Sequence, residues 1–200
     1  MQFPGRERER RERLLNRIAE AARSGIDFVQ LREKDLPTRD LEVLAREAVK
    51  RIRVGTGNTR LLINSRTDVA LAAGADGVHL RSKDVSPEQV RTIWRDAKGS
   101  PPPVIAVSCH TEQEVIAAEN SGANFVVFST VFEKEGAPHV RAAGLKLLRS
   151  ACVGKVPVLA LGGVTPQNAP LCIAAGAKGI AGIRLFQEGN LAARVAELGG

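Results

Sequence analysis

Charged and amide side chains follow an apolar run near residue 30. The segment FVQLREKDL, residues 28–36, begins like a buried strand and then carries Gln30, Arg32 and Lys34. Alternate side chains of a strand point to opposite faces, so these three would share one face and the apolar residues between them the other. Arg and Lys held together in a water-poor place can stabilise a negatively charged group such as a phosphate. The segment therefore predicts an anion site at one end of a sheet, with a solvated strand end as the alternative.

Polar or glycine residues also follow other apolar runs. Three runs end in this way: RLLI before Asn64 and Ser65, PVIAV before Ser108 and His110, and VPVLAL before Gly162 and Gly163. The glycine pair would present backbone N–H groups beside a helix start, with Thr165 as the expected N-cap and Pro166 in the first helical position. Such a loop binds phosphate or simply makes a tight turn. His110 could be a general acid or base, or a structural residue.

Seven short apolar segments alternate with helical patterns along the chain. The expected strands begin at Phe28, Arg60, Gly77, Pro103, Phe125, Val156 and Gly179. The expected helices cover residues 9–22, 41–52, 68–74, 86–94, 112–122, 143–152 and 166–176. Glycines placed as helix C-caps follow three of them, at Gly74, Gly122 and Gly176. The alternation predicts one α/β domain over residues 1–200, with a parallel sheet covered by helices.

Composition narrows the class of ligand. The net charge of +7 fits phosphate ligands or a basic surface, whereas the glutamates among the first arginines and the 4% aromatic content argue against nucleic acid. No apolar run approaches the roughly 20 residues of a membrane span, and the first residues lack the apolar core of a secretory signal. We therefore expect a cytoplasmic protein without a membrane partner. Its three cysteines match neither a disulfide framework nor a zinc site.

Five sequence blocks between about residues 28 and 186 resemble one family. The blocks are QLREK, LINSRTDVALAAGADGVHL, VSCHT, VPVLALGGVTPQN and KGIAGIRLF. In this order and spacing they are similar to the thiamine phosphate synthase family and its relatives, the TenI-type thiazole tautomerases. The resemblance implies a TIM (β/α)8 barrel and a transferase of thiamine biosynthesis. Such an enzyme would join two small phosphate substrates, an aminopyrimidine pyrophosphate and a thiazole phosphate, with Mg²⁺, and release pyrophosphate.

The resemblance also implies roles for individual residues. Catalytic roles beside the pyrophosphate fall on Arg32, Lys34 and Ser108, and the metal-binding role falls on Asp84. The implied substrate-binding residues are Gln30, Asn64, Gly162, Gly163, Ile183 and Arg184, and by their positions Ser65, His110 and Lys134 are further substrate-binding candidates. Among these, the glycine pair and the backbone at Ile183 and Arg184 match the site for the thiazole phosphate, which agrees with the usual phosphate position in barrels.

Some positions depart from the family pattern. Ser65 stands where synthases have a second metal-binding aspartate, so Asp84 alone would hold Mg²⁺. The loop after the sixth family strand reads EKEGAP, where Lys134 is the candidate for the family's lysine, and Thr130 replaces the catalytic histidine of tautomerases. A tautomerase-like enzyme and a non-catalytic regulator that binds phosphate ligands or nucleic acid therefore remain alternatives.

The amino terminus departs from the pattern as well. Family members begin with an apolar strand before the first helix, and Met1 to Phe3 is too short for that strand. We expect a barrel that lacks its first strand, in a chain that starts downstream of the family's usual start. Unpaired strand edges favour association or local opening, so a homo-oligomer is one expectation.

Overall fold

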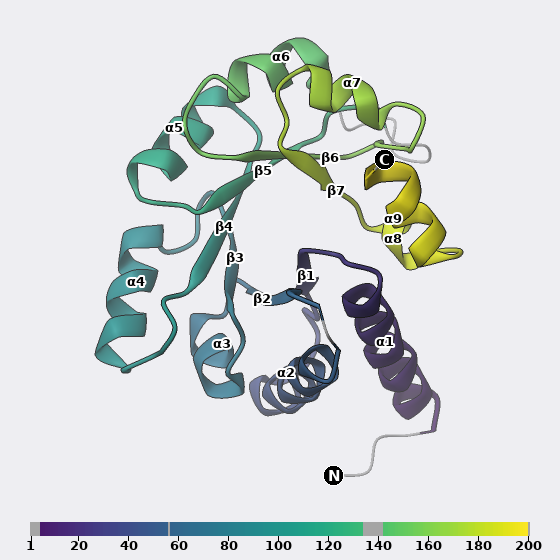
Figure 1. The fold of residues 1–200 in the computed structure, drawn as a ribbon. Helices are drawn as coiled ribbons and strands as arrows, with labels where there is room; N and C mark the ends of the chain where they lie inside the picture. The colour runs from purple at the N-terminus through teal and green to yellow at the C-terminus, as the bar shows by residue number, and fades with distance from the viewer. Residues whose placement is uncertain (1–4, 56, 134–141, 200) are drawn as a thin grey trace.

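The computed structural model describes residues 5–55, 57–133 and 142–199 and shows a single parallel sheet. Its seven strands lie side by side in chain order, from β1 to β7. They are β1 (Phe28–Leu31), β2 (Arg60–Asn64), β3 (Gly77–Arg81), β4 (Val104–Cys109), β5 (Phe125–Ser129), β6 (Val158–Leu161) and β7 (Gly179–Ala181). All seven strands expected from the sequence are confirmed. Figure 1 shows that the sheet curls into an incomplete barrel.

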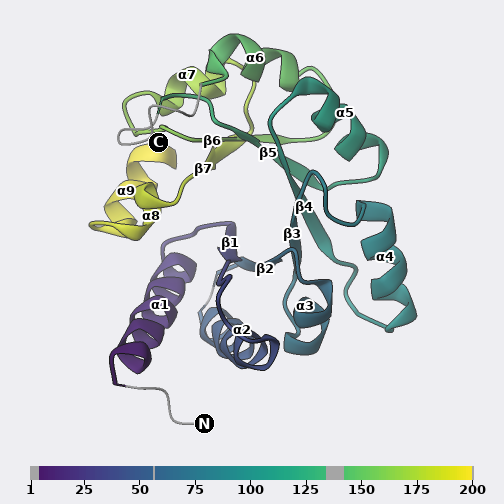
Figure 2. The same ribbon diagram turned by 180° about the vertical axis from the view of Figure 1, so that it is seen from behind.

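Nine helices occur among the described residues. They are α1 (Gly5–Arg23), α2 (Thr38–Arg53), α3 (Thr67–Ala73), α4 (Pro87–Asp96), α5 (Glu112–Asn120), α6 (Gly144–Ala151), α7 (Ala169–Ala174), α8 (Arg184–Gln187) and α9 (Leu191–Gly199). Helices α2 to α7 lie on the outer side of the curled sheet, as Figure 2 shows from behind. No helix in the described part of the chain is long and apolar enough to span a membrane.

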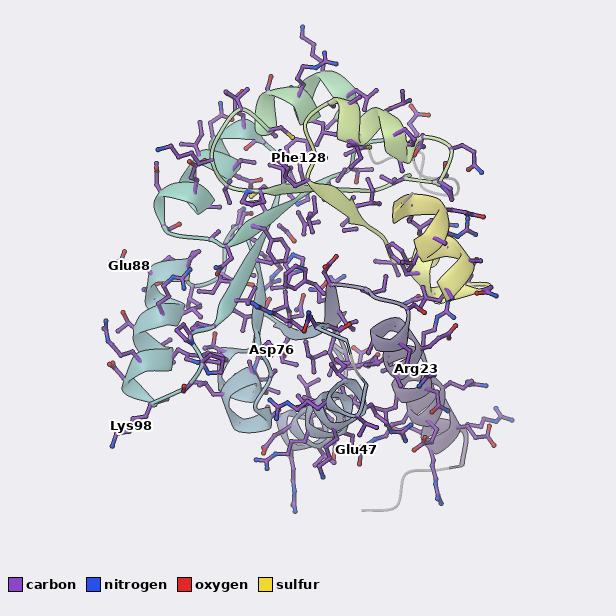
Figure 3. All side chains as sticks on the ribbon, in the orientation of Figure 1. Arg23, Glu47, Asp76, Glu88, Lys98 and Phe128 are labelled. Carbon is purple, nitrogen blue, oxygen red and sulfur yellow. The ribbon has the colours of Figure 1, made fainter. Side chains whose placement is uncertain are left out.

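Two apolar clusters lie on the two faces of the sheet. The outer cluster packs Val29 and Leu31 of β1 with the helices, and it includes Phe128 of β5, which is labelled in Figure 3. The inner cluster contains Leu62, Val104, Ala106, Phe125 and Val127, with Phe28 packed against it. The ring centroids of Phe28 and Phe125 lie 4.6 Å apart. This division confirms the alternation predicted for β1, in which Gln30 shares the inner face with Phe28.

The described strands β1 and β7 are edges of the sheet and do not pair with each other. Helix α1 lies beside this opening and contacts α9 (Figure 1). The Arg17 side chain donates hydrogen bonds from α1 to the carbonyl oxygens of Phe186 (2.9 Å), Gly189 (3.2 Å) and Glu188 (3.3 Å). One arginine therefore ties the first helix to the segment after the last strand. The expectation of a barrel that lacks one strand is confirmed.

The structure agrees with the three predicted glycine caps but places the start of one helix differently. Gly74, Gly122 and Gly176 all adopt positive φ angles after their helices, as helix C-caps do. Helix α7 begins at Ala169, not at Pro166, because residues 166–168 form a separate turn. Thr165 still closes that turn, since its hydroxyl accepts a hydrogen bond from the Asn168 amide (3.3 Å). Helices α8 and α9 were not predicted.

Candidate active site

The carboxyl ends of the parallel strands meet at one end of the incomplete barrel, which we call the mouth. Parallel pairing brings successive strand ends together, as in the pairs Asn64 with His79 and Arg81 with Ser108. Barrel enzymes place their chemistry at this end. The residues predicted from the ends of β1, β2, β3 and β4 are therefore neighbours in space.

A chain of hydrogen bonds crosses the mouth from β1 to the loop after β3. The amide nitrogen of Gln30 donates to Asn64 Oδ1 (3.0 Å), and Asn64 Nδ2 donates to Ser65 Oγ (3.2 Å). Ser65 Oγ in turn donates to Asp84 Oδ2 (2.5 Å). Four residues predicted from separate parts of the sequence thus form one network, in which the two side-chain amides hold each other in a fixed orientation.

Ser65 has an unusual backbone conformation at the centre of this network. Its φ angle of 57° lies in the left-handed region, which costs a residue other than glycine about 1 kcal/mol or more. Its backbone N–H donates to the His79 carbonyl (2.9 Å), and its hydroxyl bonds Asp84. These two interactions fix the strained residue at the end of β2.

Asp84 is held mainly by Arg81. The guanidinium donates to Asp84 Oδ1 from Nη2 (2.8 Å) and Nε (3.1 Å), and the Arg81 backbone N–H donates to Oδ2 (2.8 Å). Only 10% of the Asp84 side chain is exposed. Burial raises the pKa of Asp84, but the hydrogen bonds from Arg81 and Ser65 outweigh it and hold the pKa below its ordinary value. Asp84 is therefore a carboxylate at neutral pH.

The donor set around Asp84 does not fit a magnesium ion in this arrangement. Magnesium requires oxygen ligands in octahedral geometry. The described residues contain no group of three His, Cys, Asp or Glu side chains that could hold a metal. Asp84 supplies the one carboxylate of this network, and both of its oxygens already accept hydrogen bonds from Arg81.

His79 and Ser108 form a second pair in the mouth. His79 is 7% exposed, and its Nε2 lies 2.9 Å from Ser108 Oγ. Burial and the nearby positive charge of Arg32 lower the pKa of His79 to about 4, so its imidazole is neutral at pH 7. His79 is therefore a buried residue of β3 with a hydrogen-bond partner.

Lys34 lies in the exposed loop after β1, beyond the strand itself. The neighbouring residue Glu33 forms an ion pair with Arg10 of α1 (2.9 Å). Helix α1 therefore contacts the loop that carries both predicted cations, Arg32 and Lys34.

His110 directly follows the end of β4, and its ring contacts the end of β5. Its Nδ1 is 2.7 Å from the Ser129 carbonyl oxygen, which can only accept, so Nδ1 carries the proton. Its backbone N–H donates to the Glu114 carboxylate (2.5 Å), and Glu114 completes a capping box with Thr111 at the start of α5. The sequence signal for this position of Glu114 is the Thr-x-x-Glu spacing of a capping box. The ring leaves Nε2 as the nitrogen able to accept a hydrogen bond.

The glycine pair after β6 is needed for close packing. Gly162 and Gly163 have φ angles of 99° and 64°. A Cβ atom on Gly162 would lie 2.6 Å from Thr130 Cγ2, and one on Gly163 would lie 2.5 Å from the Glu133 carbonyl oxygen. The Gly163 carbonyl also accepts a hydrogen bond from Asn168 Nδ2 (3.0 Å). The pair makes a tight turn, and its phosphate-binding role stays a prediction.

The remaining predicted residues lie at the end of β7 or outside the described chain. Leu161 pairs with Ala181, so the glycine pair and the segment from Gly182 to Arg184 follow neighbouring strand ends. Ile183 is 57% exposed and precedes the short helix α8, which begins at Arg184. Lys134 lies outside the described residues.

Comparisons with known proteins agree with this geometry. A family model described as thiamine monophosphate synthase matches residues 4–186. The chain belongs to this family. It is 37% identical over 178 residues to a protein of Aquifex aeolicus named putative thiamine-phosphate synthase 2, covering 88% of this chain and 91% of that protein. It is 38% identical over 167 residues to a thiamine-phosphate synthase of Clostridium novyi, covering 82% of this chain and 78% of the relative.

Solved structures show the same fold. The thiamine phosphate pyrophosphorylase of Pyrococcus furiosus superposes with a TM-score of 0.79 at 28% identity, covering 95% of this chain and 89% of that one. A 3-hexulose-6-phosphate synthase superposes with a TM-score of 0.69 at 18% identity, over 94% of this chain and 92% of that chain. The second match speaks for the barrel fold alone.

Proposed function

We propose that the chain is a thiamine-phosphate synthase, a transferase that joins an aminopyrimidine pyrophosphate to a thiazole phosphate and releases pyrophosphate. The observation that carries the proposal is the mouth itself. Arg32 follows β1 two residues after Gln30, and the Gln30 amide is hydrogen-bonded to that of Asn64 at the same end of the sheet. Membership of the thiamine monophosphate synthase family and the names of the relatives support this reaction.

The proposed chemistry begins with loss of pyrophosphate. The bond between the pyrimidine methylene carbon and the pyrophosphate oxygen breaks, and the electron pair leaves with the pyrophosphate. Arg32 and Lys34, which are both exposed after β1, stabilise the negative charge that accumulates on the leaving group through charge-assisted hydrogen bonds. The thiazole nitrogen then donates its lone pair to the pyrimidine cation, forming the new carbon–nitrogen bond.

Other residues bind and orient in this proposal. The amide pair Gln30 and Asn64 offers donors and acceptors in a fixed arrangement, which suits the aminopyrimidine ring. Ser108, held by neutral His79, would bind a pyrophosphate oxygen. The backbone at Gly163 and at Ile183 would hold the thiazole phosphate. These proposed steps involve no metal, because the donor set around Asp84 does not fit one.

A tautomerase has less support. Thr130 stands at the position that the tautomerase resemblance assigns to a catalytic histidine, and it is 9% exposed. Its carbonyl accepts a hydrogen bond from the Ala143 amide (2.7 Å). A threonine hydroxyl does not exchange protons near neutral pH as an imidazole does.

We propose the cytoplasm as the location, because three free cysteines suit a reducing compartment.

The deciding experiment measures pyrophosphate release. The protein is incubated with both substrates, and thiamine phosphate and pyrophosphate should appear in equal amounts. Omitting the thiazole phosphate should abolish formation of thiamine phosphate. Isomerisation of a thiazole phosphate in the absence of any pyrimidine substrate, with no thiamine phosphate formed from both, would instead support the tautomerase. Salt-sensitive retention on nucleic acid without turnover would support a regulator.

A further inference from the structure

The carboxylate of Asp84 is fully engaged by hydrogen bonds. A carboxylate has two oxygens and about four lone-pair positions. Oδ1 accepts from Nη2 and Nε of Arg81, at 2.8 and 3.1 Å. Oδ2 accepts from the Arg81 backbone N–H at 2.8 Å and from Ser65 Oγ at 2.5 Å. An incoming cation would find no lone pair on this carboxylate without displacing one of these donors.

The arrangement is built into one turn after β3. The Asp84 backbone N–H donates to the Arg81 carbonyl (3.0 Å), which closes a turn over residues 81–84. This turn brings both the backbone and the side chain of Arg81 onto the same carboxylate. Two guanidinium N–H groups converge on Oδ1 and the backbone N–H donates to Oδ2, which fixes geometry as well as charge. Asp84 is nearly buried, so its charge needs a cation that is already in place.

A divalent metal would compete poorly with this arrangement. Mg²⁺ holds its water shell tightly and accepts only near-ideal octahedral geometry, with oxygens about 2.0–2.1 Å away. To reach Asp84 it would have to displace the guanidinium and the Ser65 hydroxyl, and Arg81 would then be left as a positive charge beside the metal. The neighbouring Ser65 offers only a neutral hydroxyl in return.

The Arg81 side chain can also reach a ligand. It is 70% exposed, whereas its partner Asp84 is 10% exposed. The guanidinium has five N–H donors, and two of them point at Asp84. The remaining donors are available for a planar, two-point contact with phosphate oxygens.

We propose that Arg81 is the resident cation of the mouth: its guanidinium neutralises Asp84 in the place that a divalent metal would need, and its other N–H groups bind the oxygens of pyrophosphate. The second half of this proposal rests on the proposed function, and the first half stands on the contacts of Asp84 alone. Metal-independent pyrophosphate binding is the property that follows.

The statement that Arg81 excludes a divalent metal is tested by titrating the protein with Mn²⁺ alone and measuring the binding by calorimetry. The proteins are the wild type, the double variant Ser65→Asp with Arg81→Gln, and the control Arg46→Gln, which removes an arginine paired with Glu42 on the surface of α2. We expect the double variant to bind Mn²⁺ at least about tenfold more tightly than the other two, because it gains a carboxylate and loses the competing cation. Equal affinities in all three proteins would overturn the proposal, provided that circular dichroism shows the double variant folded. If the double variant does not fold, the titration of the wild type tests the proposal. Saturable binding of Mn²⁺ to the wild type at submillimolar concentration would overturn the proposal, and no such binding would support it.

The anion half is tested with inorganic pyrophosphate in the presence of a metal chelator. Wild type and Arg46→Gln should bind pyrophosphate, and Arg81→Gln should bind it about tenfold more weakly or worse, as expected for loss of a charged donor. Binding that requires added Mg²⁺, or that is unchanged in Arg81→Gln, would overturn the proposal. Failure of the synthase reaction is a separate outcome, because neither titration depends on turnover.

Discussion

The buried imidazole of His79 makes the stability of the protein depend on pH. Its pKa falls from 6.5 to about 4, because burial and the charge of Arg32 both disfavour the protonated ring. In the unfolded chain His79 therefore binds a proton below about pH 6.5, whereas in the folded chain it binds one only below about pH 4. Stability from this group is complete above pH 6.5 and is lost as the pH falls through that window.

The size of the effect follows from the width of the window. Each unit of pKa difference corresponds to about 1.4 kcal/mol, so lowering the pH from 7 to 5 should cost about 2 kcal/mol through His79 alone. Urea denaturation of the wild type at both pH values measures the total change. The variant His79→Gln keeps a polar group that can reach Ser108 but has no proton to gain. Between pH 7 and pH 5 the free energy of unfolding of this variant should fall by about 2 kcal/mol less than that of the wild type.

Two results would refute this reasoning. One is an equal pH dependence in the wild type and His79→Gln, which would mean that His79 is not held neutral by the fold. The other comes from nuclear magnetic resonance titration of the imidazole, if the His79 ring protonates at the pKa of an ordinary histidine. Arg32→Ala offers an independent check of cause, since removing the neighbouring charge should raise the pKa of His79.

The remaining predictions concern Arg32, Gly163 and Arg17. Arg32→Ala should reduce pyrophosphate-releasing turnover by about 10²-fold or more, through loss of a charge-stabilising donor, and wild-type kinetics would contradict its role. Gly163→Ala should lower the free energy of unfolding more than Gly189→Ala does, by about 1–3 kcal/mol in urea denaturation, because both have positive φ but only the first would place a Cβ against a neighbour. Arg17→Met should speed amide hydrogen exchange in α8 and α9 by breaking three hydrogen bonds, one to the Phe186 carbonyl of α8 and two to the Glu188 and Gly189 carbonyls between the two helices, whereas Arg46→Met should not.

The strands and the inner face of β1 could be predicted because their signals are local. Period-two alternation placed Gln30 on the inner face, opposite Val29 and Leu31, and the structure has the same division. The glycine caps were equally local, because a left-handed residue after a helix favours glycine over any other. Such signals need no knowledge of the rest of the chain.

The end of the chain was harder because its elements are short. Helix α8 has four residues, and no periodic pattern can be recognised over one turn. Helix α9 did carry a signal, since Asn190 caps its first turn by accepting from the Ala193 amide (3.0 Å). The start of α7 was misplaced because the Thr165 cap and a proline look the same before a turn as before a helix.

The sequence predicts only part of the hydrogen-bond network that crosses the mouth. Gln30, Asn64, Ser65 and Asp84 were singled out as separate site residues, and their hydrogen bonds to one another depend on strand register. Arg81 was missed altogether. An arginine three residues before an aspartate is common at a turn, and only the fold reveals that its backbone and side chain converge on one nearly buried carboxylate.

The charges around Asp84 connect two features of the chain that the sequence presented separately. The resemblance to synthases predicts two carboxylates at positions 65 and 84, and such a pair would require a divalent cation between them. Here position 65 is a hydroxyl that donates to Asp84, and the single remaining negative charge is matched by the single positive charge of Arg81. Because the pair is already neutral, a divalent ion added to it would bring two uncompensated positive charges. The serine and the arginine therefore act in the same direction: each removes part of the reason for a metal to bind at this point of the mouth.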